Sequence, residues 1–292
     1  MTEPNIAIVA GLLPVGCDRV AAALEELGWQ PVAVQAWHES VLRAQGFQET
    51  GWVTRLPEPV SALWIDRLGV LCRRWPTGPI VVADPLATLF LGDWQAQFPT
   101  ARFVLVACAP WVGVSALFRM AGDRTLEDPE WALRVWQTYH EALLVALDQL
   151  GDRAVLVDLS AAAVEWGNET LILPDWEAVA DDRQALFQQF YPAAAALYQQ
   201  LNARALAPHP DFPIDPAAPT EAIVWLRDWA VAEQTSGQTA QLTQLQHQVG
   251  HLKPALAQSR FQLEQVRGEL SRYQARLILA DRAQQTAREA RS

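Results

Sequence analysis

The stretch IAIVAGLLPVGCDRVAAALEELG, residues 6–28, decides the fold. It opens with a β-branched apolar run, passes through a loop bounded by Gly11 and Gly16, and continues into an amphipathic segment at 19–27. A short apolar run followed directly by apolar residues at helical spacing is typical of a strand that feeds a helix through a tight turn. The stretch therefore predicts the first βα unit of an α/β sheet.

Further apolar runs repeat this strand pattern along the first two hundred residues. They are PVAVQ at 31–35, PIVVA at 79–83, RFVLVA at 102–107 and RAVLVD at 153–158. Near-continuous apolar runs are typical of strands that are buried on both faces of a parallel sheet. Helical segments at 60–74 and 129–150 lie between them. Because strands alternate with helices, residues 1–204 are expected to form an α/β domain, a doubly wound parallel β-sheet sandwich.

The pattern changes after residue 204. The segment APHPDFPIDPAAP at 207–219 contains five prolines, which stiffen the backbone and prevent a helix. Residues 205–219 are therefore predicted to be a Pro-rich linker. Residues 220–234 have the pattern of a short amphipathic helix that carries Trp225 and Trp229.

Residues 240–290 repeat apolar side chains every seven residues, which is the pattern of a coiled coil. The coiled-coil interface is expected at Leu242, Val249, Leu256, Leu263, Val266, Leu270, Tyr273 and Leu277. Pro254 removes a helical hydrogen bond, so a kink or a new helix start is expected there. Such a segment either pairs with itself or with another coiled-coil protein, or docks as a single amphipathic helix on its own domain.

Charge and composition exclude several classes of protein. The 292 residues carry a net charge of −11 and are 51% hydrophobic, so neither a nucleic-acid-binding surface nor extensive disorder is expected. Residues 253–292 carry eight basic and four acidic side chains, which leaves −15 for residues 1–252. This contrast allows the C-terminal segment to recognise an acidic partner or its own domain.

Cysteine spacing and the lengths of the apolar runs bear on the compartment. Cys17, Cys72 and Cys108 are widely spaced and form no CxxC pair, so neither a disulfide framework nor a zinc site is expected. His247 and His251 lie on the outer face of the predicted coil without a third ligand, so no metal site is expected there. The N-terminus lacks a signal-peptide pattern, and no run reaches the roughly 18 apolar residues of a spanning helix. A cytoplasmic protein without a membrane span is the expectation.

Gly11 and Gly16 have the spacing of a phosphate-binding loop, GxxxxGK[ST], in which backbone amides at a helix N-terminus hold the anion. Cys17 and Asp18 follow Gly16 in place of the basic and hydroxyl residues. An aspartate in the first turn suits the helix dipole. The same aspartate would repel a phosphate by about 1–4 kcal/mol at a surface-like dielectric. The loop has the shape of a phosphate site without its charge.

The order of segments along the chain resembles the bacterial sulfotransferase family. The landmarks are Pro14-Val15-Gly16-Cys17, Ala83-Asp84-Pro85 leading to Phe98-Pro99, RFVLVACAPWVGVSALFRMAGD at 102–123, a helix with Trp131, Trp136 and Tyr139, and the strand AVLVDL at 154–159. The likeness covers about residues 5–175 and lies in layout and hydrophobic pattern. It implies a P-loop-like α/β fold and the transfer of a sulfuryl group from 3′-phosphoadenosine 5′-phosphosulfate.

The chain departs from this family at the positions that would hold the donor. The family's basic residue in the first loop is Pro14 here, its lysine in the second landmark is Ala83, and its phosphate-binding arginine is Cys108. The family's serine falls at Ala116, or at Ser115 if the turn is one residue shorter. Charge-assisted hydrogen bonds are worth about 1.5–3 kcal/mol each, so three neutral replacements would weaken donor binding severely. The resemblance therefore implies a degenerate member that has kept the fold and lost the cofactor.

The vestigial cofactor-binding positions are Gly11, Gly16, Cys17, Asp18, Asp84 and Ser115, with no catalytic residue and no metal ligand assigned. Asp84 is also expected to cap the helix that begins at Pro85. An enzyme would need Arg19, Arg119 and Arg124 to converge on one pocket, with His38 as an acid–base group. Each of these four side chains also has a purely structural interpretation, as an exposed arginine or a packed histidine.

Two functions remain open at this point. The first is a non-catalytic binding or assembly module that acts through the surface of its α/β domain and its coiled coil, without a cofactor. The second is an active sulfotransferase, or a related nucleotide-dependent transferase, with a divergent donor site and 3′-phosphoadenosine 5′-phosphosulfate as cofactor. An open, arginine-lined pocket at the carboxyl ends of the strands would favour the second. A crevice filled by Leu12, Pro14 or Trp111 would favour the first.

Overall fold

The computed structural model describes residues 5–48, 51–120, 124–166, 169–174, 189–205 and 225–235. The chain divides into two compact units, Met1–Gln234 and Thr235–Ser292. The predicted coiled coil at 240–290, with all of its interface positions from Leu242 to Leu277, lies outside the described residues, as does the linker from 206 to 219.

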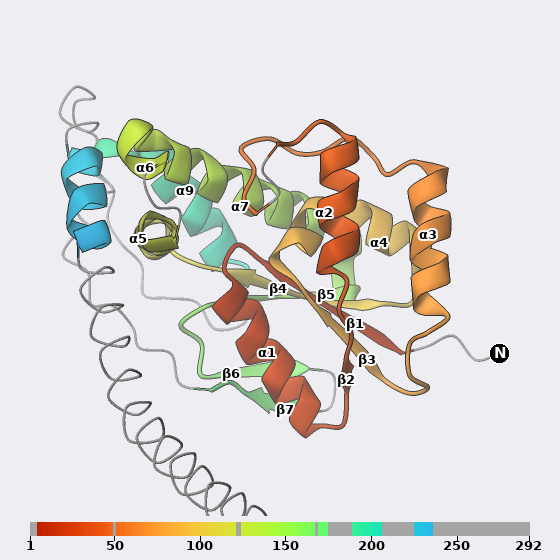
Figure 1. The fold of residues 1–292 in the computed structure, drawn as a ribbon. Helices are drawn as coiled ribbons and strands as arrows, with labels where there is room; N and C mark the ends of the chain where they lie inside the picture. Colours follow the sequence, from red (N-terminus) through yellow and green to blue (C-terminus); the bar gives the residue numbers. More distant parts are fainter. Residues whose placement is uncertain are drawn as a thin grey trace, which may run out of the picture. The chain divides into compact units, whose positions relative to one another are not determined.

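A parallel sheet of five strands forms the centre of the first unit (Figure 1). The strands are β1 (Ile6–Gly11), β2 (Gln30–Pro31), β3 (Ile80–Ala83), β4 (Arg102–Ala107) and β5 (Ala154–Asp158), and their order across the sheet is β2-β3-β1-β4-β5. In this register Ile8 lies between Val82 of β3 and Phe103 of β4. Every residue of β1 is buried, as a central parallel strand requires. The predicted α/β class and its parallel sheet are confirmed.

Helices cover both faces of the sheet. In Figure 1, α1 (Pro14–Glu26) lies on one side, together with the antiparallel hairpin of β6 (Ala163–Trp166) and β7 (Glu169–Ile172). The other side carries α2 (Gln35–Ala44), α3 (Ala62–Cys72), α4 (Leu91–Gln97) and α7 (Glu130–Leu150). Right-handed crossovers produce this arrangement, because the chain leaves β1 in one direction across the sheet and then returns in the other.

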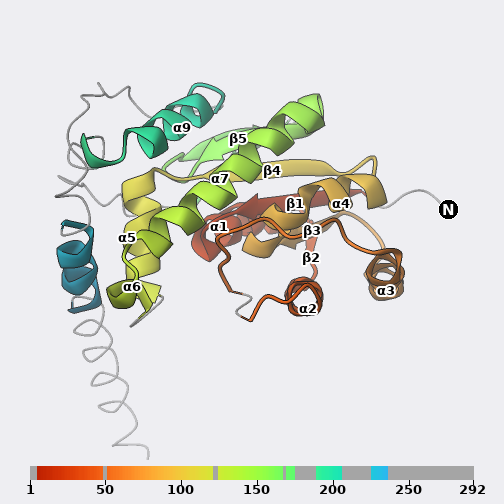
Figure 2. The same cartoon turned by 90° about the horizontal axis from the view of Figure 1, so that it is seen from above.

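The remaining elements are short or peripheral. They are the 3-10 helices η1 (Pro85–Phe90) and η2 (Gly151–Arg153), and the helices α5 (Pro110–Met120), α6 (Arg124–Glu127) and α9 (Pro192–Asn202). A further helix covers residues 225–235 and lies beside α5 and α6 (Figure 2). Within the described part of the chain, no helix has both the length and the apolar composition to cross a membrane.

Three boundaries differ from the sequence prediction, each for a local reason. Helix α1 begins at Pro14 rather than at residue 19, because a proline at the first helical position has the right φ and no amide to satisfy. Strand β2 holds only two residues at the edge of the sheet, where Pro31 is tolerated, and α2 begins at Gln35, where the strand was expected to end. The β6–β7 hairpin was not predicted.

The N-terminus of α1 is packed tightly onto the carboxyl ends of β4 and β5. A Cβ atom on Gly16 would lie 2.9 Å from Val106 Cγ1 and 3.0 Å from Leu159 Cδ1. A Cβ atom on Gly11 would lie 2.7 Å from the carbonyl oxygen of Val106. Both glycines are therefore required by close packing between α1, β1 and β4.

We expect Gly16→Ala to destabilise the fold by about 1–3 kcal/mol, because its methyl group must displace the buried side chains of Val106 and Leu159. Urea denaturation, followed by far-UV circular dichroism, measures the free energy of unfolding. Gly92→Ala in α4 is the matched control, since a Cβ there meets nothing within 4 Å. The control should be neutral or more stable by up to about 1 kcal/mol, from helix propensity. Equal stabilities for the two variants would contradict the packing role of Gly16.

Candidate functional site

The turn between β1 and α1 is short and offers few groups to an anion. Only Leu12 and Leu13 separate the end of β1 from Pro14, the first residue of α1. Pro14 has no amide hydrogen, and the amides of Gly16 and Cys17 both donate to the carbonyl of Leu13, at 3.1 and 3.4 Å. A phosphate needs several free amides at such a helix N-terminus. At the start of α1, the amide of Pro14 is therefore absent and those of Gly16 and Cys17 already have an acceptor.

Apolar side chains fill the space around the same turn. Leu12 is 1% exposed, and its Cδ2 atom would lie 3.2 Å from a Cβ placed on Gly113 of α5. Trp111, also on α5, is buried. The carbonyl of Gly11 accepts a hydrogen bond of 3.0 Å from Thr88 Oγ1. Of the three residues expected to fill the crevice in a non-enzyme, Leu12 and Trp111 are buried, while Pro14 lies exposed at the mouth of a neighbouring cavity.

That cavity, of about 450 Å³, opens beside the start of α1 and the end of β3. Its charged lining residues are Asp18 and Asp84, and none of its described lining residues is basic. Cys17 is fully buried next to it, and burial, followed by the charges of Asp84 and Asp18, raises the pKa of its thiol well above the ordinary value. The thiol is therefore protonated and is not a nucleophile.

His38 and Asp84, from α2 and the end of β3, form a buried network with Trp94. His38 Nδ1 lies 2.7 Å from Asp84 Oδ2, and Trp94 Nε1 donates to His38 Nε2 at 3.0 Å. Because Nε2 accepts from the indole, Nδ1 carries the proton and donates to the carboxylate. The other carboxylate oxygen of Asp84 accepts from the amide of Leu86 at 2.9 Å, which confirms the predicted cap of η1.

This network uses every polar atom of the His38 ring. The imidazole is also stacked on Phe90, with ring centroids 5.1 Å apart, and it is 0% exposed. A general base needs a free lone pair within reach of a substrate, and the Nε2 lone pair already faces Trp94. The arrangement joins α2, β3 and α4 and supports the structural interpretation of His38.

A second buried histidine holds the start of α5 against α7. The amide of Cys108 donates to His140 Nε2 at 3.1 Å, while His140 Nδ1 lies 2.8 Å from the carbonyl of Trp136. Trp136 Nε1 in turn donates to the carbonyl of Cys108 at 3.0 Å. Burial lowers the pKa of His140 from 6.5 to about 4, and burial with the nearby charge of Asp158 raises the pKa of the Cys108 thiol. Both side chains are neutral at pH 7, so they do not form a thiolate–imidazolium pair.

Ser115, on α5, is bound by a carboxylate from the same chain. Its hydroxyl donates to Glu233 Oε1 at 2.8 Å, and Trp229 Nε1 donates to the same oxygen at 3.2 Å. Arg119 Nε lies 3.7 Å from Glu233 Oε2. Glu233 is 6% exposed, and Trp229 packs edge-on against Phe118 with ring centroids 5.2 Å apart. The helix at 225–235 therefore docks on α5 through both a polar and an aromatic contact.

The three arginines of the enzyme alternative do not converge. Arg19 is buried and donates to the carbonyls of Leu159, Ala161 and Pro174, so it joins α1 to the segments around the β6–β7 hairpin. Arg119 pairs with Glu233, and the guanidinium of Arg124 lies over the ring of Trp131, 4.6 Å from its centroid.

The predicted cofactor-binding positions do not all lie together. Those at one edge of the sheet are Gly11, Gly16, Cys17, Asp18 and Asp84. Ser115 lies apart from them, hydrogen-bonded to Glu233.

A polar cluster at the end of β5 was not predicted from the sequence. Tyr198 of α9 donates to Asp158 Oδ2 at 2.9 Å, and the amide of Ser160 donates to Asp158 Oδ1 at 2.9 Å. Burial, then the charge of Asp158, raises the pKa of Tyr198. The signal available in the sequence was an aspartate that ends a predicted strand, while its partner lies 40 residues away. The cluster ties α9 to the sheet.

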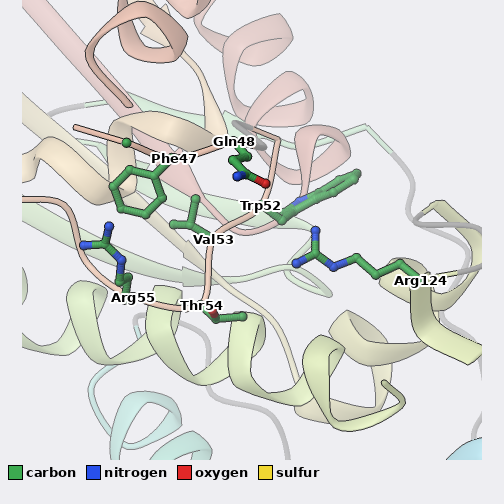
Figure 3. Close-up of a pocket in the computed structure, with 8 residues that line it drawn as sticks. Phe47, Gln48, Trp52, Val53, Thr54, Arg55 and Arg124 are labelled. Carbon is green, nitrogen blue, oxygen red and sulfur yellow. The ribbon is translucent and has the colours of Figure 1, made fainter. Parts of the chain in front are cut away.

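A second cavity, of about 220 Å³, was also not predicted; it is lined by residues 46–48, 52–55 and Arg124 (Figure 3). Two arginines, Arg55 and Arg124, line it together with Trp52 and Phe47. Trp52 also lines the larger cavity, so the two cavities are neighbours. Among the described residues there is no group of three or more His, Cys, Asp or Glu side chains that could hold a metal ion.

Comparisons with known proteins identify no family for the chain. No protein-family model matches the sequence, and no curated protein matches it.

Several solved structures are similar in part to this chain. The sulfotransferase domain from the curacin biosynthetic pathway is 13% identical, with a TM-score of 0.36, over 55% of this chain and 69% of that domain. A sulfotransferase from Alicyclobacillus acidocaldarius is 13% identical, with a TM-score of 0.36, over 81% of this chain and 96% of that protein. A gluconokinase from Sinorhizobium meliloti 1021 is 17% identical, with a TM-score of 0.28, over 54% of this chain and 84% of that protein. Likenesses of this size establish neither a family nor an activity.

We expect His140 to make the stability of the protein depend on pH. Its pKa is lowered in the folded state, so between about pH 6.5 and pH 4 the unfolded chain binds a proton that the native protein does not. The free energy of unfolding should therefore fall as the pH falls through this window, by up to about 3 kcal/mol from this residue.

Urea denaturation of the wild type and of His140→Gln at several pH values from 4.5 to 7 measures this contribution. Glutamine retains an acceptor for the Cys108 amide but does not titrate. The variant should show a shallower fall in stability with decreasing pH, whatever its absolute stability. Parallel curves would contradict the assignment.

Proposed function

We propose that the chain is a non-catalytic binding and assembly protein, in which the sulfotransferase-like α/β domain is a rigid body and the C-terminal heptads mediate association. The observation that carries this proposal is the closed β1–α1 turn, where Leu12 is buried and Gly11 and Gly16 leave no room for a methyl group. In a doubly wound sheet this is the edge at which ligands bind. Here the N-terminus of α1 packs on Val106 and Leu159, and the amides of Gly16 and Cys17 donate to the carbonyl of Leu13.

The charges at this edge also support a protein without an anionic donor. The neighbouring cavity is lined by the exposed Asp18 and the buried Asp84, and none of its described lining residues is basic. A donor such as 3′-phosphoadenosine 5′-phosphosulfate carries several negative charges, and each would be repelled by these carboxylates. The one lysine of the chain, Lys253, lies in the predicted coil.

Glu233 adds a third line of support. The resemblance places the family's phosphate-binding serine at Ala116, or at Ser115 if the turn is one residue shorter, and the hydroxyl of Ser115 donates to the carboxylate of Glu233. A buried carboxylate at 2.8 Å from the serine leaves no position there for a second anion. Donor binding would require the helix at 225–235 to leave α5. This movement would expose the buried side chains of Leu226, Trp229 and Ala230 to water.

Association is assigned to the C-terminal heptads, from Leu242 to Leu277. Six consecutive heptads with an apolar first position favour a coiled coil over an isolated helix. Partner choice is weakly specified by charge, since few Glu–Lys pairs flank the seam. We propose a second copy of the chain as the partner, because identical seams match in register.

We expect no thermal shift on titration with 3′-phosphoadenosine 5′-phosphate, even at millimolar nucleotide. A ligand that binds only the folded state stabilises it by about 2.7 kcal/mol at a hundred times its dissociation constant, which raises the melting temperature by several degrees. Differential scanning fluorimetry of the full chain measures this shift. Sodium sulfate at matched ionic strength controls for non-specific effects of salt. A saturable shift at sub-millimolar nucleotide would refute the proposal and restore the transferase alternative.

We expect the full chain to be a dimer or higher oligomer in solution, and expect Leu263→Asp with Leu270→Asp to make it monomeric. The two aspartates place charge in the middle of the predicted apolar seam. Light scattering coupled to size-exclusion chromatography gives the mass. Gln265→Asp with Ala275→Asp is the matched control, because it adds the same charge at outward heptad positions. A monomeric wild type, or an equal effect of the two pairs, would contradict association through this seam.

A further inference from the structure

Helix α3 lies at the rim of the first unit, with one side open to solvent (Figure 1). Of the described residues 62–72, which form α3, only Leu68 is buried. Leu63 and Val70 are seven residues apart, which places them on the same side of the helix. They are 59% and 46% exposed. Large apolar side chains exposed together on one helical face indicate a surface that a partner can cover.

Positive charge surrounds these two apolar side chains. Arg67 lies one turn after the first of them, and Arg73 and Arg74 lie in the turn that ends α3. All three are exposed, and the Cζ atom of Arg67 lies 4.4 Å from the ring centroid of Trp64. None of the three forms an ion pair with a residue in the described part of the chain. Asp66 is the one carboxylate of α3, so the face is cationic on a chain whose net charge is −11.

Helix α1 presents the opposite charge. The residues on its exposed side are Val15, Asp18, Ala22, Glu25 and Glu26. The two glutamates occupy the last turn, where the helix dipole disfavours negative charge, so they do not stabilise their own helix. Among the residues that the structure describes, no cation forms an ion pair with any of these three carboxylates. The acidic face of α1 is therefore available to a cationic partner.

The two faces have the same spacing and complement each other when the helices lie parallel. In each helix the two exposed apolar side chains are seven residues apart, and two charged residues follow the second of them after three and four residues. These charged residues are acidic in α1 and basic in α3. Asp18 would face both Asp66 and Arg67, whose charges offset each other. Side by side, the helices bring apolar side chains together and oppose two glutamates with two arginines.

Within one chain the two faces do not meet, because α1 and α3 lie on opposite sides of the sheet (Figure 1). We propose that α1 of one copy docks on α3 of a second copy, so that the first units join head to tail. A heterologous contact of this kind leaves one face free at each end and therefore adds further copies instead of closing a dimer. The contact goes beyond the proposed function, because it does not use the C-terminal heptads.

The size of the two faces sets the strength of the contact. Two helices of 13 and 11 residues bury far less than the roughly 1,200–2,000 Å² of a stable interface, so the contact is weak. Association through the heptads would hold several first units together. It would then raise their local concentration, and weak contacts between such units add in avidity.

Sedimentation velocity of the full chain over a concentration series tests the contact. The mass at low concentration reports association through the heptads, and growth beyond this mass toward millimolar concentration reports the contact of α1 with α3. In molar sodium chloride, where charges are screened beyond about 3 Å, the growth should disappear while the mass at low concentration is unchanged. A failure of the heptads therefore gives a monomer at low concentration and is distinct from a failure of this contact.

Charge reversal identifies the two helices. Glu25→Arg with Glu26→Arg, and Arg73→Glu with Arg74→Glu, should each raise the concentration needed for growth by about tenfold or more, because like charges then face each other. An equimolar mixture of the two variants should restore growth. In the mixture, the basic α1 of one variant meets the acidic α3 of the other, and the unchanged helices also match.

Glu141→Arg with Asp152→Arg is the matched control, since both residues are exposed, lie on α7 and η2, and change the net charge as the α1 variant does. It should leave growth unchanged. The proposal is overturned by a wild type that does not grow up to millimolar concentration, by growth that persists in molar salt, by a mixture that fails to restore growth, or by an equal loss in the control. If a variant loses its far-UV circular dichroism spectrum, the salt dependence of the wild type decides the matter.

Discussion

The close approach of α1 to the carboxyl ends of β4 and β5 is the constraint on which the rest of the site depends. A Cβ atom on Gly16 would meet Val106 and Leu159, and one on Gly11 would meet the backbone of Val106, so close packing is enough to require both glycines. Their spacing is also that of a phosphate-binding loop, so glycine spacing by itself does not separate a closely packed turn from such a loop. What distinguishes the two cases is the length of the turn and its free amides, and this turn has Leu12, Leu13 and a proline.

Several polar side chains at the carboxyl edge of the sheet form hydrogen-bond networks inside the protein. Asp84 binds His38 and the amide of Leu86, Asp158 binds Tyr198 and Ser160, and His140 bridges Cys108 to Trp136. A buried polar group without a partner costs about 1–3 kcal/mol, so each network also resists substitution of any one member. Aspartates and histidines at strand ends are often taken as catalytic candidates. Here their hydrogen bonds run between secondary-structure elements, and the same residues hold the elements together.

The sheet was predictable from the sequence, and the site was not. Four of the five strands match their apolar runs closely, because a strand that is buried on both faces has an uninterrupted local signal. Asp84 was correctly identified as a cap, since capping also depends on local sequence. The contacts of Arg19 with residues 159–174 and of Ser115 with Glu233 join segments more than a hundred residues apart. No local pattern encodes such pairs, so the sequence left Arg19 and Ser115 with open roles that only the fold resolves.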